Sequence, residues 1–246
     1  MEILRQKSIN KNYKVINNLK SIDTEKNIPV FDLGFISYVS GYDLQEEIYE
    51  LIKSNDCPGA ILLLEHYPVI TIGNNKNTDS LLVGREELRR QNIELIQSNR
   101  GGDMTLHSPG QIVCYTILNL TRFKKDLPFF IHNLEEVIID VLASYDIRGM
   151  RINKHRGVFT SGFKIASIGL RVRKWITLHG FSLNVNNNLK YFDNIIACGL
   201  KDYPQTSMEK ISNKKIPIRN VKEQILKSFS SVFETPVTGI ISSKNA

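Results

Sequence analysis

The fold is decided by the stretch Arg100-Gly101-Gly102-Asp103-Met104-Thr105-Leu106-His107-Ser108-Pro109-Gly110-Gln111, which is too rich in glycine for a helix and too polar for a buried strand. Its two adjacent glycines permit positive φ angles and bring backbone N–H groups close to a ligand. The alternation of Met104 and Leu106 with Thr105 and His107 indicates a strand leaving the turn, and Pro109-Gly110 predicts a second turn. A single glycine pair is also typical of a surface turn. The rest of the chain must therefore identify the ligand of this predicted site loop.

The composition indicates one globular domain outside the membrane. The chain has 246 residues, of which 41% are hydrophobic and 23% charged, enough to bury a substantial core. The longest apolar runs, such as residues 60–64, are too short to span a bilayer, and the N-terminus is charged where a signal peptide needs an apolar block. We expect a cytoplasmic protein with no membrane partner.

The cysteines and the net charge narrow the chemistry. Cys57, Cys114 and Cys198 are odd in number and lack metal-ligand spacing, which predicts free thiols in a reducing compartment and no metal. The net charge of +7 suits nucleic acid, an anionic membrane or an acidic protein. The 32 Lys and Arg residues are scattered and aromatic residues do not interleave with them, which argues against a nucleic-acid partner.

The pattern of elements predicts an α+β fold, with a mixed β-sheet and flanking helices. The chain divides into an N-terminal arm over residues 1–27, a main domain over 28–236 and a C-terminal tail over 237–246. Strands are predicted at 30–34, 60–64, 69–72, 112–120 and within a β-rich block at 157–185; helices are predicted behind Asp43, at 85–91, from Pro128 and around 221–232.

Two further segments carry reactive side chains. Cys198 lies between apolar residues and a glycine, so it is either a small buried hydrophobe or a nucleophile. Lys164 lies between Phe163 and Ile165, so it is either a solvated hairpin lysine or a buried ammonium beside an anion. A thiolate is such an anion, and we expect the two side chains to meet within hydrogen-bond reach, beside His107.

Four motifs stand together in one order: the loop at 100–111, Lys164-Ile165-Ala166-Ser167-Ile168-Gly169, His179-Gly180-Phe181-Ser182-Leu183-Asn184, and Ala197-Cys198-Gly199. From about Val30 to Phe233 the sequence resembles the lipoyl(octanoyl) transferases of lipoate biosynthesis. Glu65-His66 with Thr71-Ile72-Gly73 is similar to a fifth motif of that family. The resemblance implies the fold shared with the catalytic domain of biotin and lipoate protein ligases. It also implies octanoyl transfer from octanoyl-acyl carrier protein to a lysine of lipoyl domains, in 2-oxoacid dehydrogenase complexes and the glycine cleavage H protein.

The same resemblance implies a role for each matching residue. Cys198 is then the acyl-thioester nucleophile, and Lys164 lowers its pKa. The residues implied to line the acyl substrate are Arg100, Gly101, Gly102, Asp103, Met104, Thr105, Leu106, His107, Ser167, Ile168, Gly169, Gly180, Phe181 and Ser182. The chain departs from the family at Met104, Leu106, Ser108 and Cys114, which affects the shape of the acyl tunnel.

The chemistry expected of such a site uses neither ATP nor a cofactor. Exchange of a cysteine thiolate with a thioester is nearly balanced in free energy, and attack by a lysine amine then gives an amide. The alternative is an ATP-dependent lipoate or biotin protein ligase of the same fold. Cys198 distinguishes the two, because a ligase that passes through an adenylate needs the lysine but no nucleophilic thiol. The two protein substrates are expected to be acidic, which would give the positive charge a use.

Overall fold

A computed structural model describes residues 14–19, 27–55, 58–75 and 78–242. Within these residues the main sheet has eight strands in the order β11-β1-β2-β6-β10-β9-β8-β7, and a smaller sheet has three in the order β4-β3-β5. The pairs β1–β2 and β1–β11 are parallel and the other pairs of the main sheet are antiparallel. The predicted α+β fold with a mixed sheet is confirmed.

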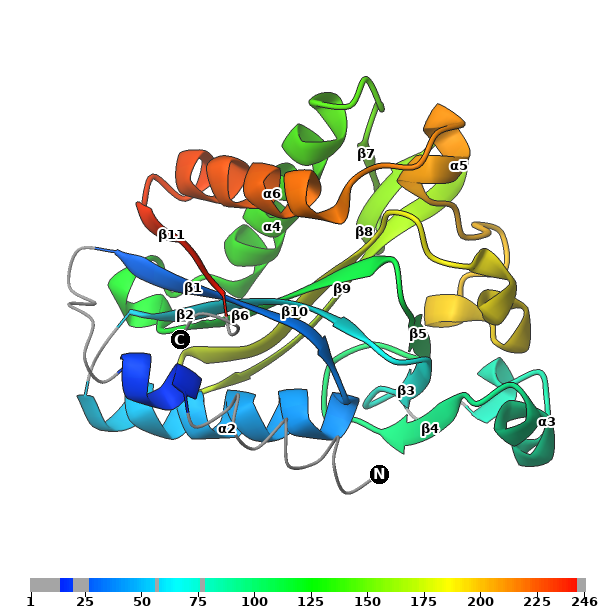
Figure 1. Cartoon of the computed structure of the whole chain (residues 1–246), viewed down its shortest axis with the longest axis horizontal. Coiled ribbons are helices and arrows are strands. Elements are labelled where there is room, and N and C mark those ends of the chain that lie inside the picture. The colour runs from blue at the N-terminus through cyan, green and yellow to red at the C-terminus, as the bar shows by residue number, and fades with distance from the viewer. Residues whose placement is uncertain (1–13, 20–26, 56–57, 76–77, 243–246) are drawn as a thin grey trace.

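Alternating apolar residues direct side chains to both faces of the main sheet, and helices cover each face (Figure 1). The strands of this sheet are β1 (Ile28–Ile36), β2 (Gly59–His66), β6 (Gln111–Leu118), β7 (Met150–Ile152), β8 (His155–Thr160), β9 (Phe163–Arg173), β10 (Ile176–Asn184) and β11 (Val237–Ser242). Helix α2 (Tyr38–Asn55) covers one face, and α4 (Leu127–Ala143) and α6 (Ile218–Val232) cover the other. Asp126 caps α4 by accepting a hydrogen bond from the Phe129 N–H.

The smaller sheet holds the predicted site loop. Its strands are β3 (Val69–Ile72), β4 (Glu94–Gln97) and β5 (Thr105–His107), and helix α3 (Arg85–Arg90) and the turn η1 (Thr78–Ser80) lie beside it. The remaining short elements are η2 (Leu120–Arg122), η3 (Leu189–Asn194), η4 (Ala197–Gly199) and α5 (Met208–Ser212). Strand β3 pairs with β5 in antiparallel fashion. The Gly101 N–H donates to the Leu170 carbonyl oxygen of β9, so the loop at 100–104 lies between the smaller sheet and the main one.

The two ends of the chain show more structure than the sequence predicts. The segment predicted as a C-terminal tail contains β11, which pairs with β1 at the edge of the main sheet. In the predicted N-terminal arm, residues 14–19 are helical, and Val15 is buried in the apolar cluster that also contains Leu33 and Ile36. Strand β11 depends on a partner about 200 residues away, and the helix at 14–19 depends on an apolar cluster formed by later residues, so local periodicity reveals neither. The division into arm, domain and tail stays a prediction.

Gly59 is required by the close approach of β2 to β6. Gly59 pairs with Leu118 and has a φ of 120°. A Cβ atom on Gly59 would lie 2.0 Å from the carbonyl oxygen of Ile117. Gly239 in β11 is a contrasting position, since a Cβ atom there meets nothing within 4 Å.

We predict that Gly59→Ala lowers the free energy of unfolding by about 1–3 kcal/mol or more, because the backbone must shift to admit the methyl group. Gly239→Ala should change it by less than about 0.5 kcal/mol. Urea denaturation of the two variants and the parent measures both values. Equal stability of the two variants would contradict the close approach.

Within the described part of the chain, no helix combines the length and the apolar character needed to cross a lipid bilayer.

Candidate active site

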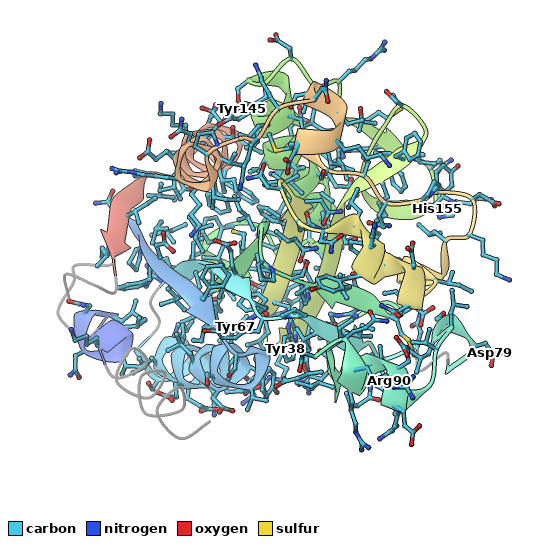
Figure 2. The ribbon with its side chains drawn as sticks, turned by 45° about the vertical axis from the view of Figure 1, so that its right-hand side comes forward. Tyr38, Tyr67, Asp79, Arg90, Tyr145 and His155 are labelled. Atoms are coloured by element: carbon cyan, nitrogen blue, oxygen red, sulfur yellow. The ribbon has the colours of Figure 1, made fainter. Side chains whose placement is uncertain are left out.

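A cavity of about 180 Å³ lies where the glycine loop faces strands β9 and β10 and the turn η4. His155, which lines the cavity, lies toward the periphery in Figure 2, whereas Tyr38, the first residue of helix α2, lies inward. The predicted site residues that line this cavity are Arg100, Gly101, Gly102, Asp103, Thr105, His107, Lys164, Ser167, Ile168, Gly169, Gly180, Phe181, Ser182 and Cys198. Segments separated by up to about 100 residues of sequence therefore meet in one place.

Met104 and Leu106 do not line the cavity. Strand alternation turns them to the opposite face from Thr105 and His107, where they pack in an apolar cluster with Ile70. The expectation that these two side chains contact the substrate is therefore not met.

Cys198 lies in the turn η4 with a strained backbone. Its φ and ψ are 57° and 18°, a left-handed conformation that is uncommon for residues with a side chain. The turn is held by a hydrogen bond of 2.7 Å from the Cys198 N–H to the Met104 carbonyl oxygen. The sulfur lies 3.6 Å from the hydroxyl oxygen of Ser167. These contacts place a partly exposed thiol at a defined position in the cavity wall.

The acidic side chain of the glycine loop packs against this turn. One carboxylate oxygen of Asp103 accepts a hydrogen bond of 2.5 Å from the Ser80 hydroxyl. A Cβ atom on Gly199 would lie 3.1 Å from the same oxygen, at a position where φ is 69°. Glycine after the cysteine is thus needed both for the backbone conformation and for the approach of Asp103.

Lys164 is buried but does not contact the sulfur. Its ammonium donates a 2.7 Å hydrogen bond to the carbonyl oxygen of Arg156 and lies 5.2 Å from the centre of the Phe159 ring. Among the described residues no hydrogen bond joins Lys164 to Cys198, so the expected direct contact is wrong. The ammonium of Lys164 instead donates to a backbone carbonyl of the paired strand β8. The two side chains nevertheless line the same cavity.

Arg100 is a second buried cation that lines the cavity. Its guanidinium is buried and donates to Thr71 through both Nε and Nη2, at 3.1 and 2.6–2.9 Å. Burial lowers the pKa of Arg100, while negative charge on Cys198 and on nearby groups opposes that shift. The sequence had assigned the role of charge partner to Lys164 alone.

The other structurally described thiol has a different environment. Cys114 lies in β6 with no exposed surface, and burial raises its pKa. A thiol that stays protonated in an apolar core is inert. Cys57 lies outside the described residues.

The inner end of the cavity carries aromatic rings that the sequence did not single out as site residues. Tyr38, Tyr115 and His179 line it together with His107, and His66 donates a hydrogen bond of 2.9 Å to the Ile36 carbonyl and accepts one of 2.7 Å from the Tyr115 hydroxyl. His66 and His179 lie within the sequence motifs quoted above, which could have identified them as site residues. No motif pointed to Tyr38.

The histidines of this cluster are neutral. Burial lowers the pKa of His66 to about 4. Burial and, to a smaller extent, neighbouring charges that include Arg100 lower the pKa values of His107 and His179 to about 3. His107 donates from Nδ1 to the amide oxygen of Gln111 at 2.7 Å, which leaves Nε2 as an acceptor.

These pKa values predict a loss of stability in acid. A histidine in the unfolded chain binds a proton near pH 6.5, whereas the buried rings stay neutral at that pH. The contribution of the neutral rings to the free energy of unfolding is therefore complete above pH 6.5 and is lost progressively below it. We expect the free energy of unfolding to fall by roughly 2 kcal/mol per buried histidine between pH 7 and pH 5.

Urea denaturation at the two pH values provides the measurement. His179→Asn, which tolerates the same backbone region, should reduce the pH dependence by about one histidine's share. The exposed His132 provides the control, since His132→Asn should leave the dependence as it is. A parent protein equally stable at both values would rule out the neutral cluster.

Comparison with solved structures places the fold in a known class. The chain superposes on lipoate-protein ligase A bound with ATP with a TM-score of 0.68 at 14% identity, covering 89% of this chain and 92% of the other. It superposes on the bi-partite lipoate protein ligase of Thermoplasma acidophilum with a TM-score of 0.70 at 14% identity, covering 89% of both chains. Residues 37–230 match the model of the lipoyl protein ligase A/B catalytic domain. The fold is that of this catalytic domain.

Sequence relatives define the family within this class. An octanoyltransferase of Thermoanaerobacter sp. (strain X514) is 42% identical over 205 residues, which cover 83% of this chain and 89% of the relative. One of Clostridium kluyveri is 38% identical over 200 residues, covering 81% and 85%. The chain belongs to the octanoyltransferase family and is an acyltransferase. The resemblance drawn from the motifs is thereby confirmed.

Proposed function

We propose that this enzyme transfers an octanoyl group from octanoyl-acyl carrier protein to a lysine of a lipoyl domain, through a thioester on Cys198. The observation that carries the proposal is the position of Cys198. In a chain 42% identical to an octanoyltransferase, it is a partly exposed thiol on a strained turn in the cavity wall. Strained residues of this kind cluster at functional sites.

The size of the cavity suits a medium-length acyl chain. Its volume of about 180 Å³ exceeds the roughly 150 Å³ of an apolar protein cavity that binds benzene, a molecule of six carbons. The inner wall is formed by buried side chains such as Val113 and Phe181. An acyl chain of eight carbons is of the right scale for this space.

The first step is thioester exchange. The Cys198 thiolate attacks the thioester carbon, the bond from that carbon to the carrier sulfur breaks, and the carrier leaves as a thiolate that takes up a proton. Arg100 places a positive charge in the same cavity, and a cysteine beside a cation is a better nucleophile as a general rule. The N–H groups of Gly101, Cys198 and Gly199 already donate to carbonyl oxygens, so they are not the donors that stabilise the oxyanion.

The second step forms the amide. The amine of the acceptor lysine attacks the same carbon, the bond to the Cys198 sulfur breaks, and the proton of the amine passes to that sulfur. Lys164 has three N–H donors and the Arg156 carbonyl engages one of them. In its neutral form Lys164 accepts the proton from the amine and returns it to the leaving sulfur.

The mouth of the cavity suits acidic protein substrates. Lys154 and Arg156 are exposed and line it, and within the described residues neither forms an ion pair. Positive charge at an entrance steers negatively charged partners toward it. On this proposal the partners are octanoyl-acyl carrier protein and the lipoyl domains of 2-oxoacid dehydrogenase complexes and the glycine cleavage H protein, in the cytoplasm.

We predict that Cys198→Ala abolishes octanoyl transfer, whereas Cys114→Ala and Cys57→Ala retain most of it. The reason is that only a partly exposed thiol in the cavity can exchange with the donor. Octanoylation of an apo lipoyl domain, measured by mass spectrometry without ATP, tests each variant. Full activity of Cys198→Ala would eliminate the covalent route, and a strict need for ATP in the parent would favour the ligase reaction.

Lys164 is predicted to support the reactivity of the thiol. Lys164→Ala should slow alkylation of Cys198 by iodoacetamide near pH 7, because a positive charge is lost from the cavity. Lys164→Arg should keep the alkylation rate closer to that of the parent yet lose transfer, since a guanidinium does not release its proton.

Lys210→Ala is the matched control. Lys210 lies over the Phe163 ring at 5.8 Å, outside the cavity lining, so its loss should alter neither rate. If Lys164→Ala shows the same pH profile of alkylation as the parent, Lys164 has no electrostatic role at the thiol.

A further inference from the structure

We propose that His179 closes the inner end of the acyl channel and so sets the longest acyl chain that the enzyme accepts. A polar network from helix α2 holds His179 in that position. The inference rests on the proposed function, because it concerns the acyl chain carried by Cys198.

The register of β9 and β10 gives the spacing between the reacting end of the channel and His179. Ser167, whose hydroxyl is 3.6 Å from the Cys198 sulfur, pairs with Ser182. His179 lies three residues before Ser182 on the same strand, a distance of about 10 Å at roughly 3.3 Å per residue. The seven carbon–carbon bonds of an octanoyl chain, at about 1.5 Å each, span at most about 10 Å. The two lengths agree.

Two glycines lie between these points, and neighbouring groups pack closely against both: a Cβ atom on Gly169 would lie 3.2 Å from Cδ of Arg100, and one on Gly180 would lie 2.1 Å from the carbonyl oxygen of Cys114. Gly169 pairs with Gly180 midway between the serine pair and His179, and both glycines line the cavity. The rings of Tyr115 and His179 meet edge to face at 6.1 Å beyond them. From the serine pair to the two buried rings, the cavity wall thus consists of these glycines and the Arg100 side chain.

The backbone of His179 is in an uncommon conformation. Its φ is 62°, within an otherwise extended strand, and its N–H donates a 2.7 Å hydrogen bond to the side-chain oxygen of Gln45 on α2. The ring stacks with Tyr42 of the same helix at 6.0 Å. Helix α2 therefore holds His179 in this uncommon conformation through two contacts.

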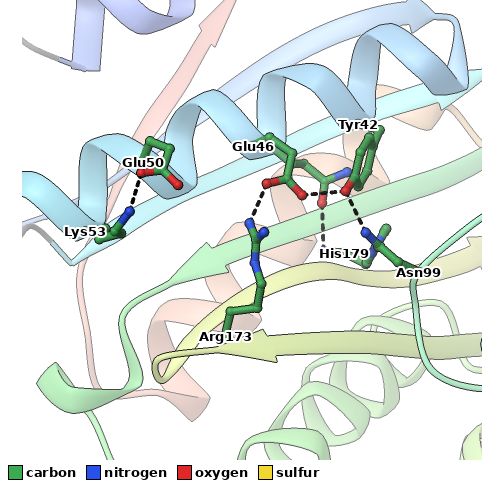
Figure 3. Close-up of polar contacts among 8 residues, drawn as sticks. Tyr42, Glu46, Glu50, Lys53, Asn99, Arg173 and His179 are labelled. Carbon is green, nitrogen blue, oxygen red and sulfur yellow. Dashed lines mark hydrogen bonds and ion pairs between the residues drawn. The ribbon is translucent and has the colours of Figure 1, made fainter.

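A chain of hydrogen bonds fixes the ring itself (Figure 3). Arg173 pairs with Glu46, which accepts a 2.5 Å hydrogen bond from the Tyr42 hydroxyl. The same hydroxyl oxygen accepts from the Asn99 amide at 2.6 Å, and the Asn99 oxygen accepts from Nε2 of His179 at 2.8 Å. Because the Glu46 carboxylate can only accept, the direction of every hydrogen bond in this series is fixed.

The ring therefore carries its proton on Nε2 and an acceptor on Nδ1. Nδ1 is buried and has no hydrogen-bond partner among the described residues. His179 is 2% exposed and lines the cavity. An acyl chain longer than the channel would have to push apolar carbons against this polar, rigidly held ring. Tyr42 and Asn99 behind it are partly exposed, so removing the ring opens the channel toward the surface.

The test is acylation of Cys198 by octanoyl-, decanoyl- and dodecanoyl-acyl carrier protein, followed by intact-protein mass spectrometry. In His179→Gly, where glycine suits the positive φ, the preference for octanoyl over dodecanoyl should fall by about tenfold or more. Tyr42→Phe should shift the ratio in the same direction by less, since it removes only the hydroxyl that joins Glu46 to Asn99.

Lys53→Ala is the control, because it breaks the exposed Lys53–Glu50 pair on the same helix and should leave the ratio unchanged. An unchanged ratio in folded His179→Gly would overturn the inference, and if that variant fails to fold, an unchanged ratio in Tyr42→Phe does so. Failure of the parent to take up any octanoyl group would instead refute the proposed function.

Discussion

The site depends on one backbone hydrogen bond, from the Cys198 N–H to the Met104 carbonyl at 2.7 Å. It joins the turn η4 to the glycine loop across 94 residues of sequence and holds the cysteine in a left-handed conformation that it would rarely adopt alone. Met104 can provide this carbonyl because its side chain is anchored in the apolar cluster on the far side of β5. A residue that does not touch the cavity thus fixes the thiol that lines it.

The cavity that contains the thiol has two kinds of buried polar side chain, cations and neutral histidines. Arg100 and Lys164 are buried cations that line the cavity with Cys198 and donate hydrogen bonds to backbone or hydroxyl oxygens, which reduces the cost of burying their charge. At the inner end, the histidines are neutral because burial lowers their pKa values. The inner end therefore adds neutral rings to the cavity, and Arg100 is the cation whose charge acts on them.

Sequence patterns predicted the elements whose conformation depends on neighbouring residues. The apolar run at 60–64, the glycine loop and the helix begun by Pro128 all appear near their expected positions. Strand β11 was missed because its place depends on β1, about 200 residues away. The motifs located Cys198 and Lys164, but the partner of the lysine depends on which carbonyl of β8 lies beside it. The network on α2 was invisible because Tyr42, Glu46 and Asn99 become one unit only after folding.

The most direct test of the central claim is to mix the protein with octanoyl-acyl carrier protein, without ATP, and to map the product by mass spectrometry. We predict a gain equal to one octanoyl group, located on the peptide that contains Cys198, and its loss when an apo lipoyl domain is added. The absence of an adduct, or an adduct on a peptide containing another cysteine, would contradict the account.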